Sequence, residues 1–133
     1  MLSTIAVATD GSSTAQQAVE SAFELARAFD AEIVILTAFS GDAAVNGVWE
    51  SSSATHAERV LATAEEAAAE RGLRHSSAIS EGDPAEVIVG LAERQGADML
   101  VVGSVGMHRR VLGSVPNTVT HKATCHVFVV KTD

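Results

Sequence analysis

The sequence has little of three things that would each indicate a particular class of protein. Its only cysteine is Cys125, so no disulfide can form within the chain. No apolar run approaches the roughly 20 residues that a membrane-spanning helix needs. No basic stretch precedes the short apolar run near the N-terminus, which argues against a signal peptide. We therefore expect a cytoplasmic protein that does not enter a membrane.

Positive charge is also scarce. The chain has 9 Lys and Arg residues against 17 Asp and Glu residues, for a net charge of −8. Such a surface repels nucleic acid and anionic lipid, so neither is expected as a main partner. The five histidines show no metal-ligand spacing, and we expect no metal site of the protein's own. No nucleophile, base and orienting group occur in a recognisable order, so an efficient enzyme is not expected.

Apolar segments alternate with amphipathic ones along the whole chain. The predicted strands are 4–9, 32–39, 73–80, 97–104 and 126–131. The predicted helices are 15–29, 55–72, 82–96 and 114–123. This alternation predicts one α/β domain over residues 1–133, a three-layer α/β/α sandwich whose five-stranded parallel sheet has the order 3-2-1-4-5.

Local signals support several of these boundaries. Asp83 as N-cap, Pro84 at the first helical position and Glu86 in a capping box predict a helix start. Gly72 is placed to end the preceding helix. Residues 40–54 show no clear period and are predicted to be a loop.

The predicted strand order also indicates where a ligand would bind. In open parallel sheets, ligands bind beyond the carboxyl ends of the strands, where the winding direction reverses. Here that point lies between the first and fourth strands. The chain leaves those strands through "ATDGS" (8–12) and "VGSVG" (102–106), so these two turns should meet at the crevice.

The residue types in and after these turns suit a nucleotide. Gly103 and Gly106 lack side chains, which allows a ligand to approach the backbone closely. Gly113 and Ser114 lead into a predicted helix N-terminus, which favours an anion. Asp10 could accept hydrogen bonds from a ribose or an adenine. The plainer alternative is that the glycines only satisfy turn geometry, and that Asp10 and Ser114 cap the helices that follow them.

Three segments resemble the universal stress protein family: "IAVATDGSSTAQQAV", "EGDPAEVIVGLAERQGADMLVVGSVG" and "LGSVPNTVTHKATCHVFVVK". The resemblance runs along the whole chain. It implies an α/β sandwich with a five-stranded parallel sheet, as the periodicity predicts. It also implies a homodimer, which in this family often forms through the last strand, here His126–Lys131.

One branch of that family binds ATP through a signature of glycine, two residues, glycine, nine residues, glycine and then serine or threonine. The fixed positions correspond here to Gly103, Gly106, Gly113 and Ser114, and Val115 follows them. The resemblance further implies that Asp10 contacts the nucleoside, and that Ala38 and Val102 line the adenine pocket.

The spacing of this signature departs from the family pattern. Only six residues, "MHRRVL", separate Gly106 from Gly113. The shorter segment could still span about 23 Å, enough for both of its ends to reach one triphosphate. It has fewer N–H donors, and Pro116 removes another. Arg109 and Arg110 could replace them as charged donors, or could be solvated surface residues.

The resemblance therefore predicts a stress-response protein that binds ATP, accompanied by magnesium, as a regulatory ligand. Any ATP hydrolysis should be slow and incidental. Two alternatives stay open. One is a module that binds no nucleotide and acts through an unidentified protein partner. The other is a protein that binds cAMP, whose single phosphate needs fewer donors and suits a shorter loop.

Overall fold

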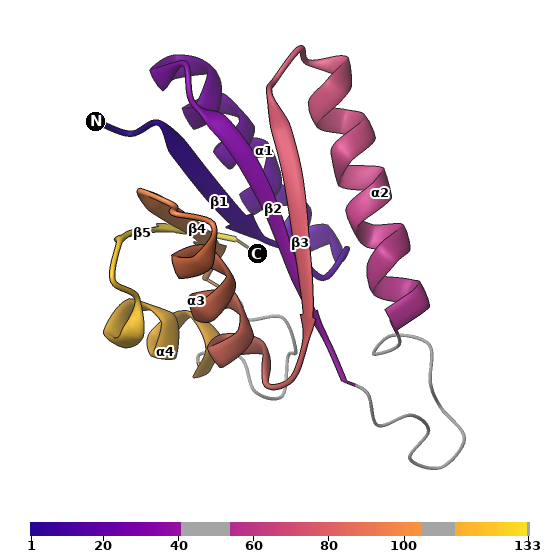
Figure 1. The fold of residues 1–133 in the computed structure, drawn as a ribbon, viewed down its shortest axis with the longest axis vertical. Coiled ribbons are helices and arrows are strands. Elements are labelled where there is room, and N and C mark those ends of the chain that lie inside the picture. The colour runs from indigo at the N-terminus through magenta and orange to yellow at the C-terminus, as the bar shows by residue number, and fades with distance from the viewer. Residues whose placement is uncertain (41–53, 105–113, 133) are drawn as a thin grey trace.

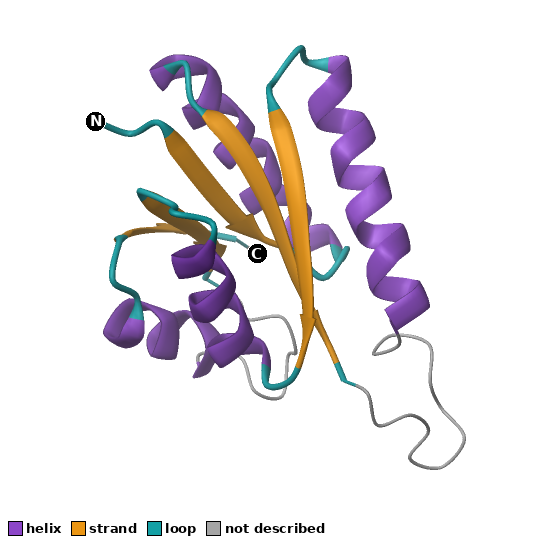
Figure 2. Cartoon of the chain, viewed as in Figure 1, coloured by secondary structure: helices purple, strands orange, loops and turns teal. Residues whose placement is uncertain are grey.

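A computed structural model describes residues 1–40, 54–104 and 114–132, and its strands and helices alternate throughout (Figure 1, Figure 2). In chain order the elements are β1 (Thr4–Ala8), α1 (Ser13–Phe29), β2 (Glu32–Phe39), α2 (Ala54–Glu70), β3 (His75–Glu81), α3 (Pro84–Arg94), β4 (Met99–Gly103), α4 (Ser114–Lys122) and β5 (His126–Val130). All nine predicted segments are confirmed in type and order.

The strands form a five-stranded sheet with the order β3-β2-β1-β4-β5. Every pair of neighbouring strands is parallel. The predicted order is therefore confirmed, with β1 at the centre and with β3 and β5 at the two edges. This arrangement puts the carboxyl ends of all five strands at one edge of the sheet.

The sheet lies between two layers of helices (Figure 1). Ile5 and Ile33 belong to a buried cluster that joins the sheet to α1 and α2. Ala6 and Val34, the next residues along the same strands, belong to a second cluster on the side of α3 and α4. Successive strand residues point to opposite faces, and both faces are covered. This double burial explains why the strands are continuous apolar runs in the sequence.

The helix boundaries follow the local sequence signals, with one difference. Asp83 is the N-cap of α3, where its carboxylate accepts the Glu86 N–H at 3.3 Å, and Pro84 is the first helical residue. Gly72 has a positive φ of 70° just after α2, as expected of a residue that ends a helix. The N-cap of α1 is Ser12, not Asp10: its hydroxyl accepts the Ala15 N–H at 3.2 Å.

Several predicted elements are a residue or two longer than the observed ones. The segment predicted as strand 73–80 begins at His75, because Leu73 donates its N–H to Ala68 and thereby completes the turn after α2. The predicted loop 40–54 lies outside the described residues except at its two ends. Its last residue, Ala54, is the first of α2.

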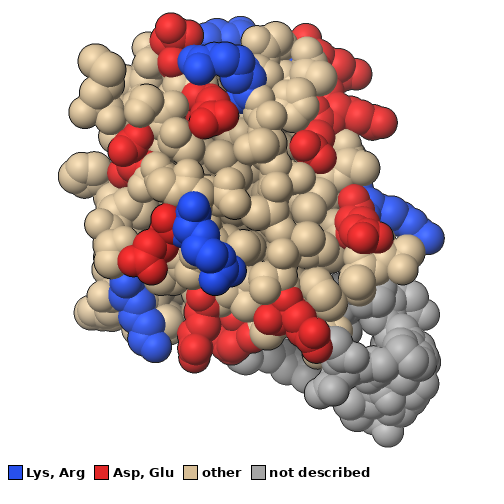
Figure 3. Space-filling view, viewed as in Figure 1, with Lys and Arg blue, Asp and Glu red and all other residues tan. Residues whose placement is uncertain are grey.

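In the described part of the chain, no helix is both long and apolar enough to cross a membrane. On the face shown in Figure 3, the Lys and Arg side chains of the described residues lie dispersed among Asp and Glu.

Candidate functional site

The candidate site lies where the chain leaves two adjacent strands toward opposite faces of the sheet. From β1 the chain enters α1, which packs with the cluster that contains Ile5. Beyond β4 it reaches α4, whose Val115 packs in the cluster on the other face. Since β1 and β4 are neighbours, this is the reversal point at which open parallel sheets bind ligands. The predicted position of the crevice is thus consistent with the observed topology.

The carboxyl edge of the sheet has a step at this point. Ala8, the last residue of β1, is level with Leu36 of β2. Strand β2 continues beyond that level to Phe39, and among the described residues it pairs there with β3 alone. Strand β1 therefore ends before β2 does at the carboxyl edge of the sheet, and the turn that follows β1 begins beside β2.

Two threonine hydroxyls hold the chain as it leaves β1. Thr37 Oγ1 donates a 2.6 Å hydrogen bond to the carbonyl oxygen of Thr9, and each threonine is only 2% exposed. Thr9 Oγ1 accepts the Gly11 N–H at 3.0 Å. The turn that carries Asp10 is thus fixed by buried side chains at the ends of two strands.

Asp10 is half-buried within that turn. Its Oδ1 atom accepts the Ser12 N–H at 2.9 Å. Its other oxygen, Oδ2, has no hydrogen bond to any part of the chain that the structure describes. A carboxylate held on one oxygen and open on the other could accept a bond from a sugar hydroxyl or a base amine.

The apolar residues that the resemblance assigns to the adenine pocket share one face of the sheet. Val102 and Val115 are both buried in the cluster on the side of α3 and α4, together with Ala8. Ala38 lies two positions beyond Leu36 of that cluster, and therefore points to the same face. These residues are consistent with one apolar wall next to the Asp10 turn.

Gly103 has a packing role that the sequence did not reveal. A Cβ atom there would lie 3.3 Å from Thr132 Cγ2 and 3.9 Å from Ala18 Cβ, on the side of α1. Thr132 is buried, and its N–H donates to Ser104 Oγ at 2.9 Å. The absent side chain of Gly103 thus leaves space for a threonine that follows β5. A ligand role for this glycine stays a prediction.

Sequence reasoning also missed Thr9 and Thr37. Each is a hydroxyl residue near the end of an apolar run, "IAVAT" and "EIVILT". Such a residue is the signal that could have identified them. Their contact depends on the register between β1 and β2, which the sequence alone did not define.

The segment between the last two site glycines is not described. Gly106, Arg109, Arg110 and Gly113 all lie outside the described residues, so their roles stay predictions. Ser114 is the first residue of α4, as predicted. Pro116 is the third residue of that helix, where it supplies no N–H to an anion.

A separate depression of about 480 Å³ lies at the opposite, amino-terminal edge of the sheet. Its lining includes Asp98, Cys125 and His126. Burial raises the pKa of the Cys125 thiol, which keeps the thiol protonated at neutral pH and weakens it as a nucleophile. No cluster of metal-binding side chains occurs among the described residues. The depression lies away from the reversal point, so the carboxyl edge is the better candidate site.

Comparison with known proteins identifies the family. The model of the universal stress protein family matches residues 1–131. This chain belongs to that family. Among its universal stress protein relatives is MJ0531 of Methanocaldococcus jannaschii, which is 36% identical over 138 residues. The match covers 96% of this chain and 81% of that protein.

Solved universal stress proteins share the fold over almost the full chain. One, crystallised in complex with cAMP, gives a TM-score of 0.80 at 31% identity and covers 99% of this chain and 98% of that one. Another, from Arabidopsis thaliana with AMP bound, gives a TM-score of 0.78 at 25% identity, with 98% and 92% covered. Nucleotide binding therefore occurs in structural neighbours of this universal stress protein.

Proposed function

We propose that this universal stress protein binds an adenine nucleotide at the carboxyl ends of β1 and β4, as a regulatory ligand in the response to stress. The observation that carries the proposal is the place of Asp10 at the point where the sheet reverses its winding, where its Oδ2 atom accepts no hydrogen bond from the described residues. Two solved neighbours at 31% and 25% identity hold cAMP and AMP, which supports the same class of ligand.

Polar and apolar groups of the site would bind different parts of the nucleotide. Asp10 Oδ2 would accept hydrogen bonds from the nucleoside, and the wall of Ala38, Val102 and Val115 would pack against the base. Because α4 begins at Ser114, the positive end of its dipole lies at the carboxyl edge, where phosphates would bind. ATP is the proposed physiological ligand, and magnesium would enter only with its phosphates.

A cyclic nucleotide is the second candidate. The neighbour bound to cAMP is the more similar of the two nucleotide-bound structures compared above. The six-residue spacing between Gly106 and Gly113, with Pro116 following, provides fewer N–H donors than the family signature. One phosphate needs fewer donors than three, so a shorter segment suits cAMP.

The first test is thermal unfolding of the nucleotide-stripped protein with millimolar Mg·ATP, AMP or cAMP. A ligand at 100 times its Kd adds about 2.7 kcal/mol of stability, which raises Tm by up to roughly 10 °C. Asp10→Asn should reduce the shift, because the amide can keep the turn but carries no charge. Gly113→Val should abolish it. A shift with cAMP alone would identify a single-phosphate site.

The matched control is Asp83→Asn. Asp83 is also a carboxylate that accepts a backbone N–H just after a strand, but it caps α3 rather than lying at the reversal point. The Tm shift of this variant should equal that of the parent protein. If no nucleotide raises Tm, the nucleotide proposal is wrong and the protein-interaction alternative takes its place.

We further propose that the protein is a cytoplasmic homodimer that pairs through β5. This strand is hydrogen-bonded to β4 on one side and forms an edge of the sheet on the other. Phe128 and Val129, which point to opposite faces, are 41% and 43% exposed. An exposed apolar edge strand is a template for pairing with a second chain.

A further inference from the structure

The turn after β1 makes hydrogen bonds that depend on a side chain from another strand. Thr9 donates its N–H to the Leu36 carbonyl oxygen at 3.0 Å, as the last backbone bond between β1 and β2. One residue further along β2, Thr37 reaches back and donates its hydroxyl to the carbonyl oxygen of Thr9 at 2.6 Å. Both polar groups of the Thr9 backbone are thus held by β2.

The contact between Thr37 and Thr9 is buried, so its loss should affect the turn. Thr37 and Thr9 are each 2% exposed, so water does not readily replace the hydroxyl if it is removed. An unpaired buried carbonyl is unfavourable, and the chain would relieve it by moving. The residue that would move is Thr9, whose own hydroxyl accepts the Gly11 N–H.

We propose that Thr37 is a positioning residue for the nucleotide site. Its hydroxyl fixes the Thr9 carbonyl and, through the bond from Gly11 to Thr9 Oγ1, sets the direction in which Asp10 is presented. The Thr37 hydroxyl already donates its hydrogen to the Thr9 carbonyl oxygen, so we expect it to act on a ligand through the turn. This inference rests on the proposed function for its effect on affinity, but its effect on the turn can be measured without any nucleotide.

The test compares three variants. Thr37→Val keeps the shape of the side chain and removes the hydroxyl, whereas Thr37→Ser keeps the hydroxyl. The matched control is Thr4→Val, since the Thr4 hydroxyl also links β1 to β2, by a 3.5 Å bond to Glu32 Oε1, but at the opposite end of the strands. Tm is measured for each protein without ligand to confirm folding.

The first readout is hydrogen exchange of the Gly11 amide by NMR in the protein without ligand. Thr37→Val should accelerate this exchange by about tenfold, near the upper range expected for loss of one neutral hydrogen bond. Thr37→Ser should restore it, and Thr4→Val should leave it unchanged. Parental exchange at Gly11 in Thr37→Val would overturn the inference, whatever happens to affinity.

The second readout is the Kd for AMP, cAMP and Mg·ATP by calorimetry. Thr37→Val should weaken the ligand that binds by about tenfold, with recovery in Thr37→Ser. Faster Gly11 exchange with unchanged affinity would also overturn the inference, because the turn would then not govern binding. If the parent protein binds none of the three nucleotides, the proposed function fails, while Gly11 exchange still decides whether Thr37 holds the turn.

Discussion

At the scale of single residues, Asp98 ties the N-terminal segment to the start of β4. Its Oδ2 atom accepts the N–H groups of Thr4 and Ser3 at 3.0 Å each, and the Ser3 hydroxyl at 3.1 Å. These bonds favour the ionised carboxylate, the Thr4 amide most strongly, and so lower the pKa of Asp98 below its ordinary value of 3.8. The contact therefore stabilises the folded state more when the carboxyl is ionised than when it is protonated.

Acid should weaken the contact between Asp98 and the N-terminal segment, because protonation removes the charge of the carboxylate. A carboxyl whose pKa is lower in the folded than in the unfolded state contributes fully above its unfolded pKa and loses that contribution as pH falls through its folded pKa. Urea unfolding of the parent protein and of Asp98→Asn, compared between pH 6 and pH 2, should show their difference in stability shrinking in acid. Parallel stability curves would contradict this role for Asp98.

At the scale of elements, the turn after β1 packs directly against α2. Gly11 has a φ of +83°, and a Cβ atom there would lie 2.8 Å from Val60 Cγ2. Both the backbone conformation and the close approach therefore require glycine. The helix α2 thus limits the space available to the turn that carries Asp10.

Gly11→Ala should lower the free energy of unfolding by about 2 kcal/mol, from the positive φ together with the overlap on Val60. In a Val60→Ala background the overlap is relieved, so the same change should cost only about 1 kcal/mol. Urea unfolding of both single variants and the double variant measures this coupling. Strictly additive losses would show that α2 does not press on the turn.

The sequence predicted the elements well because each depends on local signals or on burial of both sheet faces. The run 32–39 corresponds to β2 at both ends, and Asp83 with Pro84 marked the start of α3. The contacts that shape the site were not predictable in this way. Thr37 meets Thr9, and Thr132 meets Ser104, each across 28 residues of sequence. Such contacts require the strand register, which no local pattern specifies.

At the scale of the whole molecule, the two edges of the sheet differ in character. Strand β3, "HSSAISE", is largely polar, whereas β5, "HVFVV", is apolar and presents Phe128 and Val129. Charged or polar residues on an edge discourage pairing with another chain, and apolar ones permit it. The contrast is why β5, rather than β3, is the proposed dimer edge.

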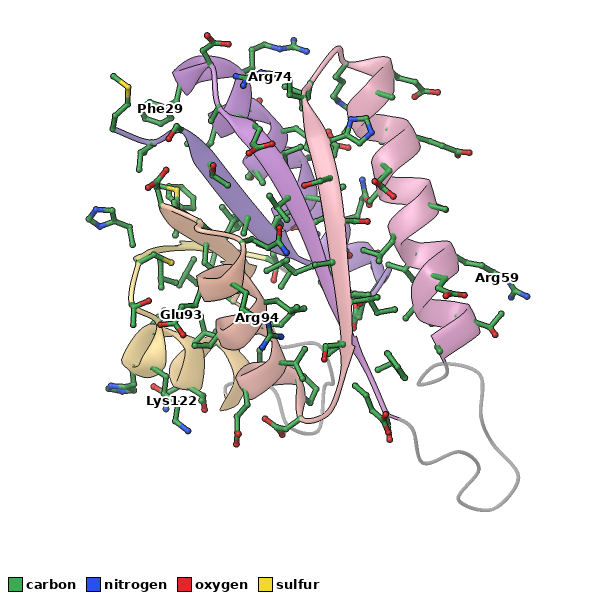
Figure 4. All side chains as sticks on the ribbon, viewed as in Figure 1. Phe29, Arg59, Arg74, Glu93, Arg94 and Lys122 are labelled. Atoms are coloured by element: carbon green, nitrogen blue, oxygen red, sulfur yellow. The ribbon has the colours of Figure 1, made fainter. Side chains whose placement is uncertain are left out.

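Phe128→Lys should convert the proposed dimer to a monomer, because it places a charge in the middle of each pairing strand. Light scattering after size-exclusion chromatography measures the mass. The matched control is Phe29→Lys, the same change at a 50% exposed phenylalanine at the end of α1 (Figure 4). That variant should stay dimeric. A parent protein that elutes as a monomer would refute the pairing through β5.

The central place of β1 has a consequence for biosynthesis. Ile5 and Val7 pair with Met99 and Val101, so one side of β1 is completed only when β4 has emerged from the ribosome. Until then β1 can pair with β2, and β2 with β3, but the other side of β1 is an unpaired apolar edge. The interval before β4 emerges is thus the one in which an edge of the central strand is open to pairing with another chain.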